Sequence, residues 1–236
     1  MPSFALLHSL FLSPLSWQGV GAELAAGGDQ VRLLDCRDVV RSAVSYYDEV
    51  ARVVADQLPR QGVLVVHSAA GALAPSILAA SKGPLAGVVF VDALLPHPGR
   101  SWLETAPPSL KALIEERVAD DHRVPPWPRL LPPPLLERLV PDVAMRLALI
   151  EGSPSVPLSL LREPAPALDL PPELNVAYVQ LSDSYDSEAQ AAQKRGWRVL
   201  RLAGDHLWPL THAAQVATAV TDAAYWFGSR LSGRRR

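Results

Sequence analysis

The stretch VLVVHSAAGAL, residues 63–73, places a serine where a buried strand runs into a helix. Apolar residues lead directly to His67 and Ser68, and the small residues Ala69, Ala70 and Gly71 follow. The N-terminus of a helix carries unpaired N–H groups and a partial positive charge, and both stabilise an oxyanion. By itself, this stretch is as compatible with a serine that caps the helix as with a nucleophile in acyl transfer, and other residues must decide between the two.

A serine is a weak nucleophile unless a base lies beside it. The segment LAGDHLWPL offers His206, just past an apolar run at 197–203 and 138 residues after Ser68. His212 is the alternative, but it falls at the start of the closing helical segment. We therefore expect His206 to be the base.

These residues need a scaffold, and the chain alternates between apolar runs and segments with helical spacing. Continuous apolar strands separated by helices are typical of a parallel sheet that is covered on both faces, an α/β fold. The pattern predicts strands at 3–8, 31–36, 62–67, 86–93, 175–182 and 197–203, and helices at 45–58, 69–81, 187–196 and 212–231.

The middle of the chain breaks this alternation. Between Pro96 and Pro172 lie 17 of the 23 prolines, a density that excludes continuous strands and long helices. Short helices fit between the prolines at 109–120, 134–140 and 141–152. We predict a core at 1–95 and 173–236, with a proline-rich helical cap at 96–172 inserted before the last two strands.

The order of these parts, with Ser68 at a strand–helix turn and His206 near the end, resembles the α/β-hydrolase fold. The G-x-S-x-G pattern of that fold's nucleophile elbow would place glycine at Val66 and Ala70, so the chain departs from it at both positions. The opening LLHSLFLSPLSW is similar to the His-Gly-x segment of the plant esterase and hydroxynitrile-lyase branch, with Ser9 in place of glycine. The resemblance implies an oxyanion hole made by the backbone N–H groups of Leu10 and Ala69.

The resemblance also implies an acid that orients the histidine, in one of two places. Asp92 ends the strand before the cap, 24 residues after Ser68, as in some haloalkane dehalogenases. Asp183 and Asp186 follow the strand after the cap, but the family's spacing from that strand falls on Tyr185 between them. We favour Asp92 and keep Asp183 and Asp186 as alternatives.

Composition excludes several other classes of function. A formal net charge of −2 gives no general attraction to nucleic acid or to a membrane surface, and no apolar run reaches the length of a membrane span. No phosphate-binding or dinucleotide motif is present, and Asp120, Asp121 and His122 are too closely spaced for a metal site, so we expect no cofactor and no metal. The single cysteine, Cys36, is typical of a reducing compartment. The apolar N-terminal segment lacks the basic residues that begin a signal peptide, so both observations favour a cytoplasmic protein.

The predicted function is a serine hydrolase that cleaves an ester, thioester or lactone of a small apolar molecule. The alternative is a cyclase, lyase or isomerase of the same fold that uses Ser68 and His206 for acid–base chemistry in a biosynthetic pathway. A third reading is a binding module without catalysis. Arginine makes up 19 of the 22 basic residues, which suggests a bacterial source with a GC-rich genome. The oligomeric state is left open, with a homodimer as one option.

Overall fold

A six-stranded sheet forms the centre of the molecule in the computed structural model, which describes residues 3–233. The strand order is β2-β1-β3-β4-β7-β8, and every neighbouring pair runs parallel. The two central strands β3 and β4 are buried along their whole length, as their continuous apolar runs predict. The strands are β1 (Ser3–Leu7), β2 (Gln30–Leu34), β3 (Val63–Ser68), β4 (Gly87–Ala93), β7 (Val176–Gln180) and β8 (Arg198–Arg201).

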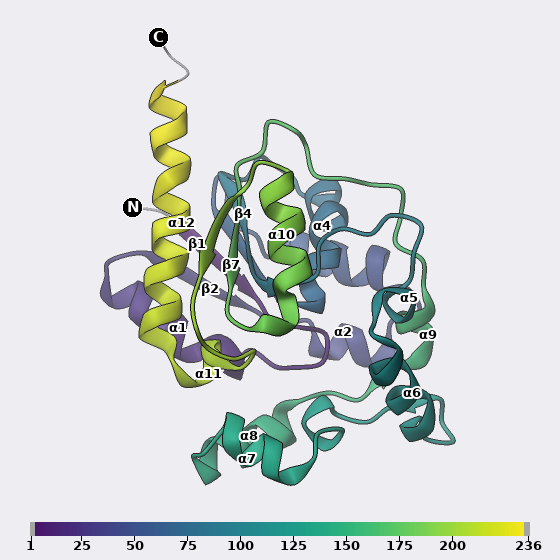
Figure 1. The fold of residues 1–236 in the computed structure, drawn as a ribbon. Coiled ribbons are helices and arrows are strands. Elements are labelled where there is room, and N and C mark those ends of the chain that lie inside the picture. Colours follow the sequence, from purple (N-terminus) through teal and green to yellow (C-terminus); the bar gives the residue numbers. More distant parts are fainter. Residues whose placement is uncertain (1–2, 234–236) are drawn as a thin grey trace.

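Helices cover both faces of this sheet (Figure 1). On one face lie α1 (Leu15–Ala26) and α12 (Ala213–Gly233), which pack against each other and against Phe4 and Leu6 of β1. The other face carries α3 (Ala51–Asp56), α4 (Ala74–Ala80) and α10 (Asp186–Lys194), where Ala5 and Leu7 point. Alternate side chains of each strand thus enter two separate apolar layers. The predicted α/β fold is confirmed.

The segment between β4 and β7 consists of short elements, which Figure 1 shows in teal at one end of the sheet. Prolines occupy the first turns of α6 and α7, where a missing N–H group costs no hydrogen bond. The division into domains at residues 96 and 172 stays a prediction. The elements are α5 (Trp102–Thr105), α6 (Pro108–Arg117), α7 (Pro133–Leu139), α8 (Val143–Gly152), α9 (Leu158–Arg162) and the antiparallel pair β5 (Arg123–Val124) and β6 (Val156–Pro157).

Several helical segments of the core differ from the expectation. The structure adds α1, a short α2 (Arg37–Ser42) and a short α11 (Trp208–Thr211), which sequence spacing did not reveal. The helix expected over 45–58 is a π-helical turn, Tyr46–Val50, followed by α3. The helix expected over 69–81 begins as a 3₁₀ turn, Ala69–Leu73, before α4. No helix among the described residues combines the length and the apolar character that crossing a membrane requires.

Candidate active site

Ser68 occupies the turn between β3 and the 3₁₀ turn that follows it, with 8% of its surface exposed. Its backbone has φ 57° and ψ −129°, a conformation that residues other than glycine rarely adopt. Gly71 makes this sharp turn fit, because a Cβ atom there would overlap the carbonyl oxygen of Leu94. The strained turn holds the Ser68 side chain at the carboxyl edge of the sheet.

Asp92 lies beside Ser68 at the end of the neighbouring strand β4. The pairing of β3 with β4 slips here, since His67 pairs with Val91 whereas Ser68 pairs with Ala93. Asp92 is therefore the extra residue of a bulge, and its φ of 43° reflects this. A bulge changes the direction of a side chain, and this one directs the carboxylate to the sheet edge.

Four donors surround the Asp92 carboxylate, which is fully buried. The N–H groups of Leu181 and Ser182 donate to Oδ1 at 2.8 and 3.0 Å. The Ser182 hydroxyl donates to Oδ2 at 2.7 Å, and His206 Nδ1 lies 2.8 Å from the same oxygen. Burial alone would raise the pKa of Asp92, but the hydrogen bonds and charge of His206, together with the other donors, hold this pKa below its ordinary value. The group is therefore a carboxylate at neutral pH.

His206 lies on the loop after β8 and joins Asp92 to Ser68. Its Nδ1–H donates to the Asp92 carboxylate, which leaves Nε2 as an acceptor for the Ser68 hydroxyl at 3.0 Å. We refer to Ser68, His206 and Asp92 as the trio. Since their three elements end at the same edge of the sheet, residues 24 and 138 positions away from Ser68 meet at one point.

His67 contacts His206 and helps to hold the loop that carries it. The two imidazole rings lie 4.5 Å apart between centroids, and His67 Nε2–H donates to the His206 carbonyl oxygen at 3.1 Å. Burial, with a smaller contribution from the nearby His206, lowers the pKa of His67 to about 3. His67 therefore stays neutral at physiological pH and adds no charge beneath the trio.

The predicted oxyanion donors are Leu10 and Ala69. Both residues are buried, and among the described residues neither backbone N–H has a hydrogen-bond partner. Buried N–H groups nearly always have a partner in a folded protein. Since these two have none in the part of the chain that the structure describes, each can still donate a hydrogen bond to an oxyanion. Ser9, at the position where the resemblance implied glycine, accepts a long 3.4 Å hydrogen bond from the Phe11 N–H.

The alternative residues take other positions. His212 stacks on Trp208 and lies 2.9 Å from the Thr211 hydroxyl. Asp186 accepts a hydrogen bond from the Gln180 side chain, and Asp183 is exposed. The structure brings none of these three to Ser68 or His206.

Two further side chains contact the trio, although neither was predicted as a catalytic residue. Ser182 holds Asp92 through both its N–H group and its hydroxyl. The Tyr185 hydroxyl lies 3.4 Å from Ser68 Oγ, and its ring stacks on His206. For Tyr185 a signal existed, since it stands where the family's spacing places an acid.

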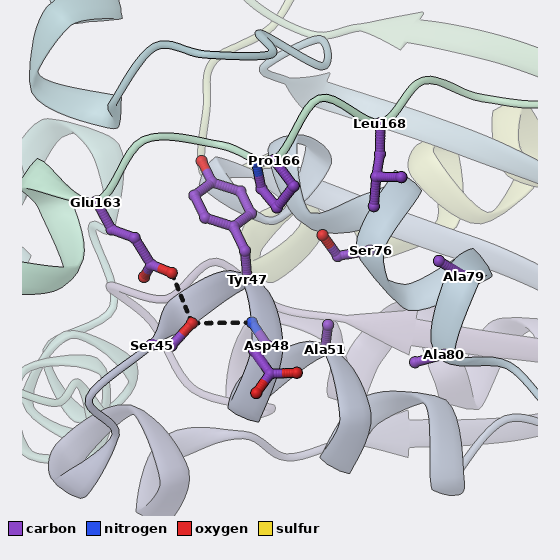
Figure 2. Close-up of a pocket in the computed structure, with 10 residues that line it drawn as sticks. All are labelled: Ser45, Tyr47, Asp48, Ala51, Ser76, Ala79, Ala80, Glu163, Pro166 and Leu168. Atoms are coloured by element: carbon purple, nitrogen blue, oxygen red, sulfur yellow. Dashed lines mark hydrogen bonds between the residues drawn. The ribbon is translucent and has the colours of Figure 1, made fainter.

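Two cavities lie away from the trio. One, of about 510 Å³, lies beside α3 and α4, and Tyr47, Ser76 and Glu163 are among the residues that line it (Figure 2). Another, of about 760 Å³, lies among α6, α7 and α8. Neither includes a member of the trio. Within residues 3–233, no three His, Cys, Asp or Glu side chains come together as metal ligands.

The fold of this chain is similar to the folds of solved structures. One is an extracellular alpha/beta-hydrolase from a Paenibacillus species, described as sharing structural and functional homology with tobacco salicylic acid binding protein 2. It is 19% identical, with a TM-score of 0.78 over 94% of this chain and 99% of that one. A pyrethroid hydrolase from Sphingobium faniae is 18% identical, with a TM-score of 0.70 over 94% and 97% of the two chains.

A variant of tomato methylketone synthase I, in complex with beta-ketoheptanoate, is 14% identical, with a TM-score of 0.66 over 96% of this chain and 98% of that one. At these identities the likeness shows the fold alone. No curated protein sequence matches this chain. The model of the alpha/beta hydrolase family matches residues 4–219, which include the whole trio. The chain therefore belongs to the alpha/beta hydrolase family.

Proposed function

We propose that this protein is a serine hydrolase that cleaves an ester, thioester or lactone of a small apolar molecule. The observation that carries the proposal is the unbroken series of hydrogen bonds from Ser68 Oγ to His206 at 3.0 Å and from His206 to Asp92 at 2.8 Å. This is the arrangement that converts a serine hydroxyl into a nucleophile.

In the proposed reaction, Ser68 Oγ attacks the substrate carbonyl carbon while His206 Nε2 takes the hydroxyl proton. Asp92 stabilises the imidazolium that forms and keeps it oriented. The backbone N–H groups of Leu10 and Ala69 bind the oxyanion. His206 then gives its proton to the leaving group. Water next attacks the acyl carbon while His206 takes its proton, and His206 returns a proton to Ser68 Oγ as the acid departs.

The residues around the trio support an apolar substrate. Trp127, from the segment between β4 and β7, lies 6.1 Å from the His206 ring between centroids. The ring of Tyr185 also borders His206, and its hydroxyl lies 3.4 Å from Ser68 Oγ. We propose that the segment at 96–172 acts as a cap that covers the substrate and selects it. A cytoplasmic location is part of the proposal, since Cys36 is a buried free thiol, and cell fractionation tests it.

A panel of short-chain esters, thioesters and lactones tests the hydrolase proposal. We expect the parent to hydrolyse at least one of these classes, and Ser68→Ala to lose at least about 10³-fold in kcat. A burst of the released alcohol or thiol, equal in amount to the enzyme, would demonstrate an acyl-enzyme where deacylation is slow. A folded parent that turns over no member of the panel would contradict the proposal.

A second candidate is a lyase, cyclase or isomerase, and it rests on Tyr185. A phenol, an imidazole and a serine hydroxyl meet at one point, which suits proton transfer without an acyl-enzyme. The fold is shared with a methylketone synthase as well as with hydrolases. Turnover that leaves Ser68 unacylated at every time point would favour this candidate.

A further inference from the structure

Tyr185 touches the reacting atom of the proposed hydrolase. It ends the 3₁₀ turn Asp183–Tyr185, which follows β7, and its hydroxyl lies 3.4 Å from Ser68 Oγ. Its ring lies nearly parallel to the His206 imidazole, at an interplanar angle of 6° and a centroid distance of 5.1 Å. The phenol hydroxyl and His206 Nε2 therefore reach Ser68 Oγ from the same side.

The hydroxyl of Tyr185 is available to a ligand. An O–H···O hydrogen bond is usually 2.5–3.0 Å long, so the 3.4 Å contact with Ser68 is weak. Burial raises the pKa of Tyr185 above its ordinary value, and the neighbouring Asp92 charge raises it further. Tyr185 thus keeps its proton at neutral pH and acts as a donor rather than as a base.

The position of this donor decides which substrate oxygen it meets. In the tetrahedral intermediate, the carbonyl oxygen faces the N–H groups of Leu10 and Ala69. The leaving-group oxygen must face His206 Nε2, because that nitrogen supplies its proton. Since Tyr185 stacks on His206, its hydroxyl lies on the leaving-group side of Ser68 Oγ.

We propose that Tyr185 is a further catalytic residue whose hydroxyl donates a hydrogen bond to the leaving-group oxygen, which suits the enzyme to esters of unactivated alcohols. As the bond from the carbonyl carbon to that oxygen breaks, its electron pair stays on the oxygen. The oxygen takes the proton from His206 Nε2 and departs as an alcohol, while Tyr185 keeps its own proton. The inference rests on the proposed function, because it requires an acyl-enzyme on Ser68.

Two esters of one acyl chain test this role. The chain that the parent prefers is prepared as an ethyl ester and as a p-nitrophenyl ester, and kcat/KM, which reports the steps through acylation, is measured for each. A strongly basic ethoxide needs the donor, whereas p-nitrophenolate does not. We expect Tyr185→Phe to lose about tenfold to hundredfold on the ethyl ester, the range for a hydrogen bond to a charged group, and less than about threefold on the p-nitrophenyl ester.

The phenylalanine variant keeps the ring that stacks on His206, so a purely structural role predicts no loss on either ester. Tyr47→Phe is the matched control, because the Tyr47 hydroxyl bonds to His97 at 3.1 Å, away from the trio. No loss for Tyr185→Phe, or an equal loss on both esters, would overturn the role at the leaving group while the parent's activity upholds the hydrolase. A parent that hydrolyses neither ester and does not react with a fluorophosphonate would overturn both proposals.

Discussion

The backbone of Ser68 is strained in the folded protein. A non-glycine residue at φ 57° and ψ −129° costs about 1–3 kcal/mol, which the surrounding fold must offset. The two neighbours on the helix side, Ala69 and Ala70, are small and buried, so the chain can turn sharply at this point. The strain belongs to the backbone and is independent of the hydroxyl.

Replacement of Ser68 by glycine or by alanine separates these two properties. Both variants lose the hydroxyl, but only glycine adopts a positive φ without steric cost. We expect Ser68→Gly to be more stable than Ser68→Ala by about 1 kcal/mol, measured as the free energy of unfolding in urea. An alanine variant that is as stable as the glycine variant would show that the turn is not strained.

The lowered pKa of Asp92 predicts how the stability of the protein depends on pH. Its pKa is lower in the folded chain than the ordinary value of about 3.9, so the unfolded state binds its proton more readily. The stabilisation from the ionised carboxylate is thus present above about pH 3.9 and is lost as the pH falls through the folded-state pKa. We expect the difference in unfolding free energy between the parent and Asp92→Asn to shrink with acidification, measured by urea denaturation from pH 7 to pH 3.

The same variant tests which acid orients His206. We expect Asp92→Asn to reduce kcat by up to about 10⁴-fold on the best ester, as loss of the acid of a triad does. Asp183→Asn is the control, because that side chain is exposed and makes no contact with the trio. A large loss for Asp183→Asn with little loss for Asp92→Asn would assign the acid to the other strand.

At the scale of elements, the strands could be predicted because a strand buried on both faces leaves a continuous apolar run. The strand–helix turn at Ser68 could be predicted as well, because the apolar run of the preceding strand ends there. The helix α1 could not, because Gly19 and Gly21 lower its helix propensity. Gly19 serves tertiary packing instead, since a Cβ atom there would lie 2.7 Å from that of Ala213 on α12.

The sequence narrows the acid that orients His206 to Asp92, Asp183 and Asp186, and it favours Asp92. It does not show which of the three carboxylates contacts His206. The bulge that turns Asp92 toward His206 arises from the pairing of β3 with β4 and has no local signal. The ring contacts that Tyr185 and His67 make with His206 likewise depend on three strands meeting at one edge of the sheet. Spacing along the chain reveals elements, whereas these contacts come from the order of strands in the sheet.

Replacement of Gly71 tests how closely the turn after Ser68 approaches the end of β4. An added methyl group would overlap the Leu94 carbonyl oxygen, so β4 or the 3₁₀ turn must move. We expect Gly71→Ala to lose about 1–3 kcal/mol of stability and to lower kcat/KM, as measured by urea unfolding and ester hydrolysis. Gly83→Ala is the control, because no atom lies within 4 Å of its added Cβ. Equal stability of the two variants would contradict the close approach.

At the scale of the whole molecule, the segment between β4 and β7 is packed onto the core by an apolar cluster. Leu149 of α8 is fully buried in it. The core contributes Leu12, from the loop before α1, as well as Leu207 and Leu210. Trp127 extends the same junction to His206. Movement of this segment would therefore change the surroundings of the trio.

Leu149→Ala tests whether the segment and the core unfold together. We expect it to lose about 2–4 kcal/mol and to unfold in one transition that is the same by circular dichroism and by tryptophan fluorescence. Leu147→Ala, on the same helix but 53% exposed, should lose less than about 1 kcal/mol. Two separate transitions in the parent would show that the segment is an independent unit.

The central claim is that Ser68 is an activated nucleophile, and intact mass after incubation with a fluorophosphonate tests it most directly. The parent should gain the mass of one phosphonyl group at Ser68, and Ser68→Ala and His206→Ala, both checked for folding, should not. Because the reagent reacts with an activated serine whatever the natural substrate is, the result does not depend on finding that substrate. A folded parent that remains unmodified, or a Ser68→Ala variant that is still modified, would contradict the account.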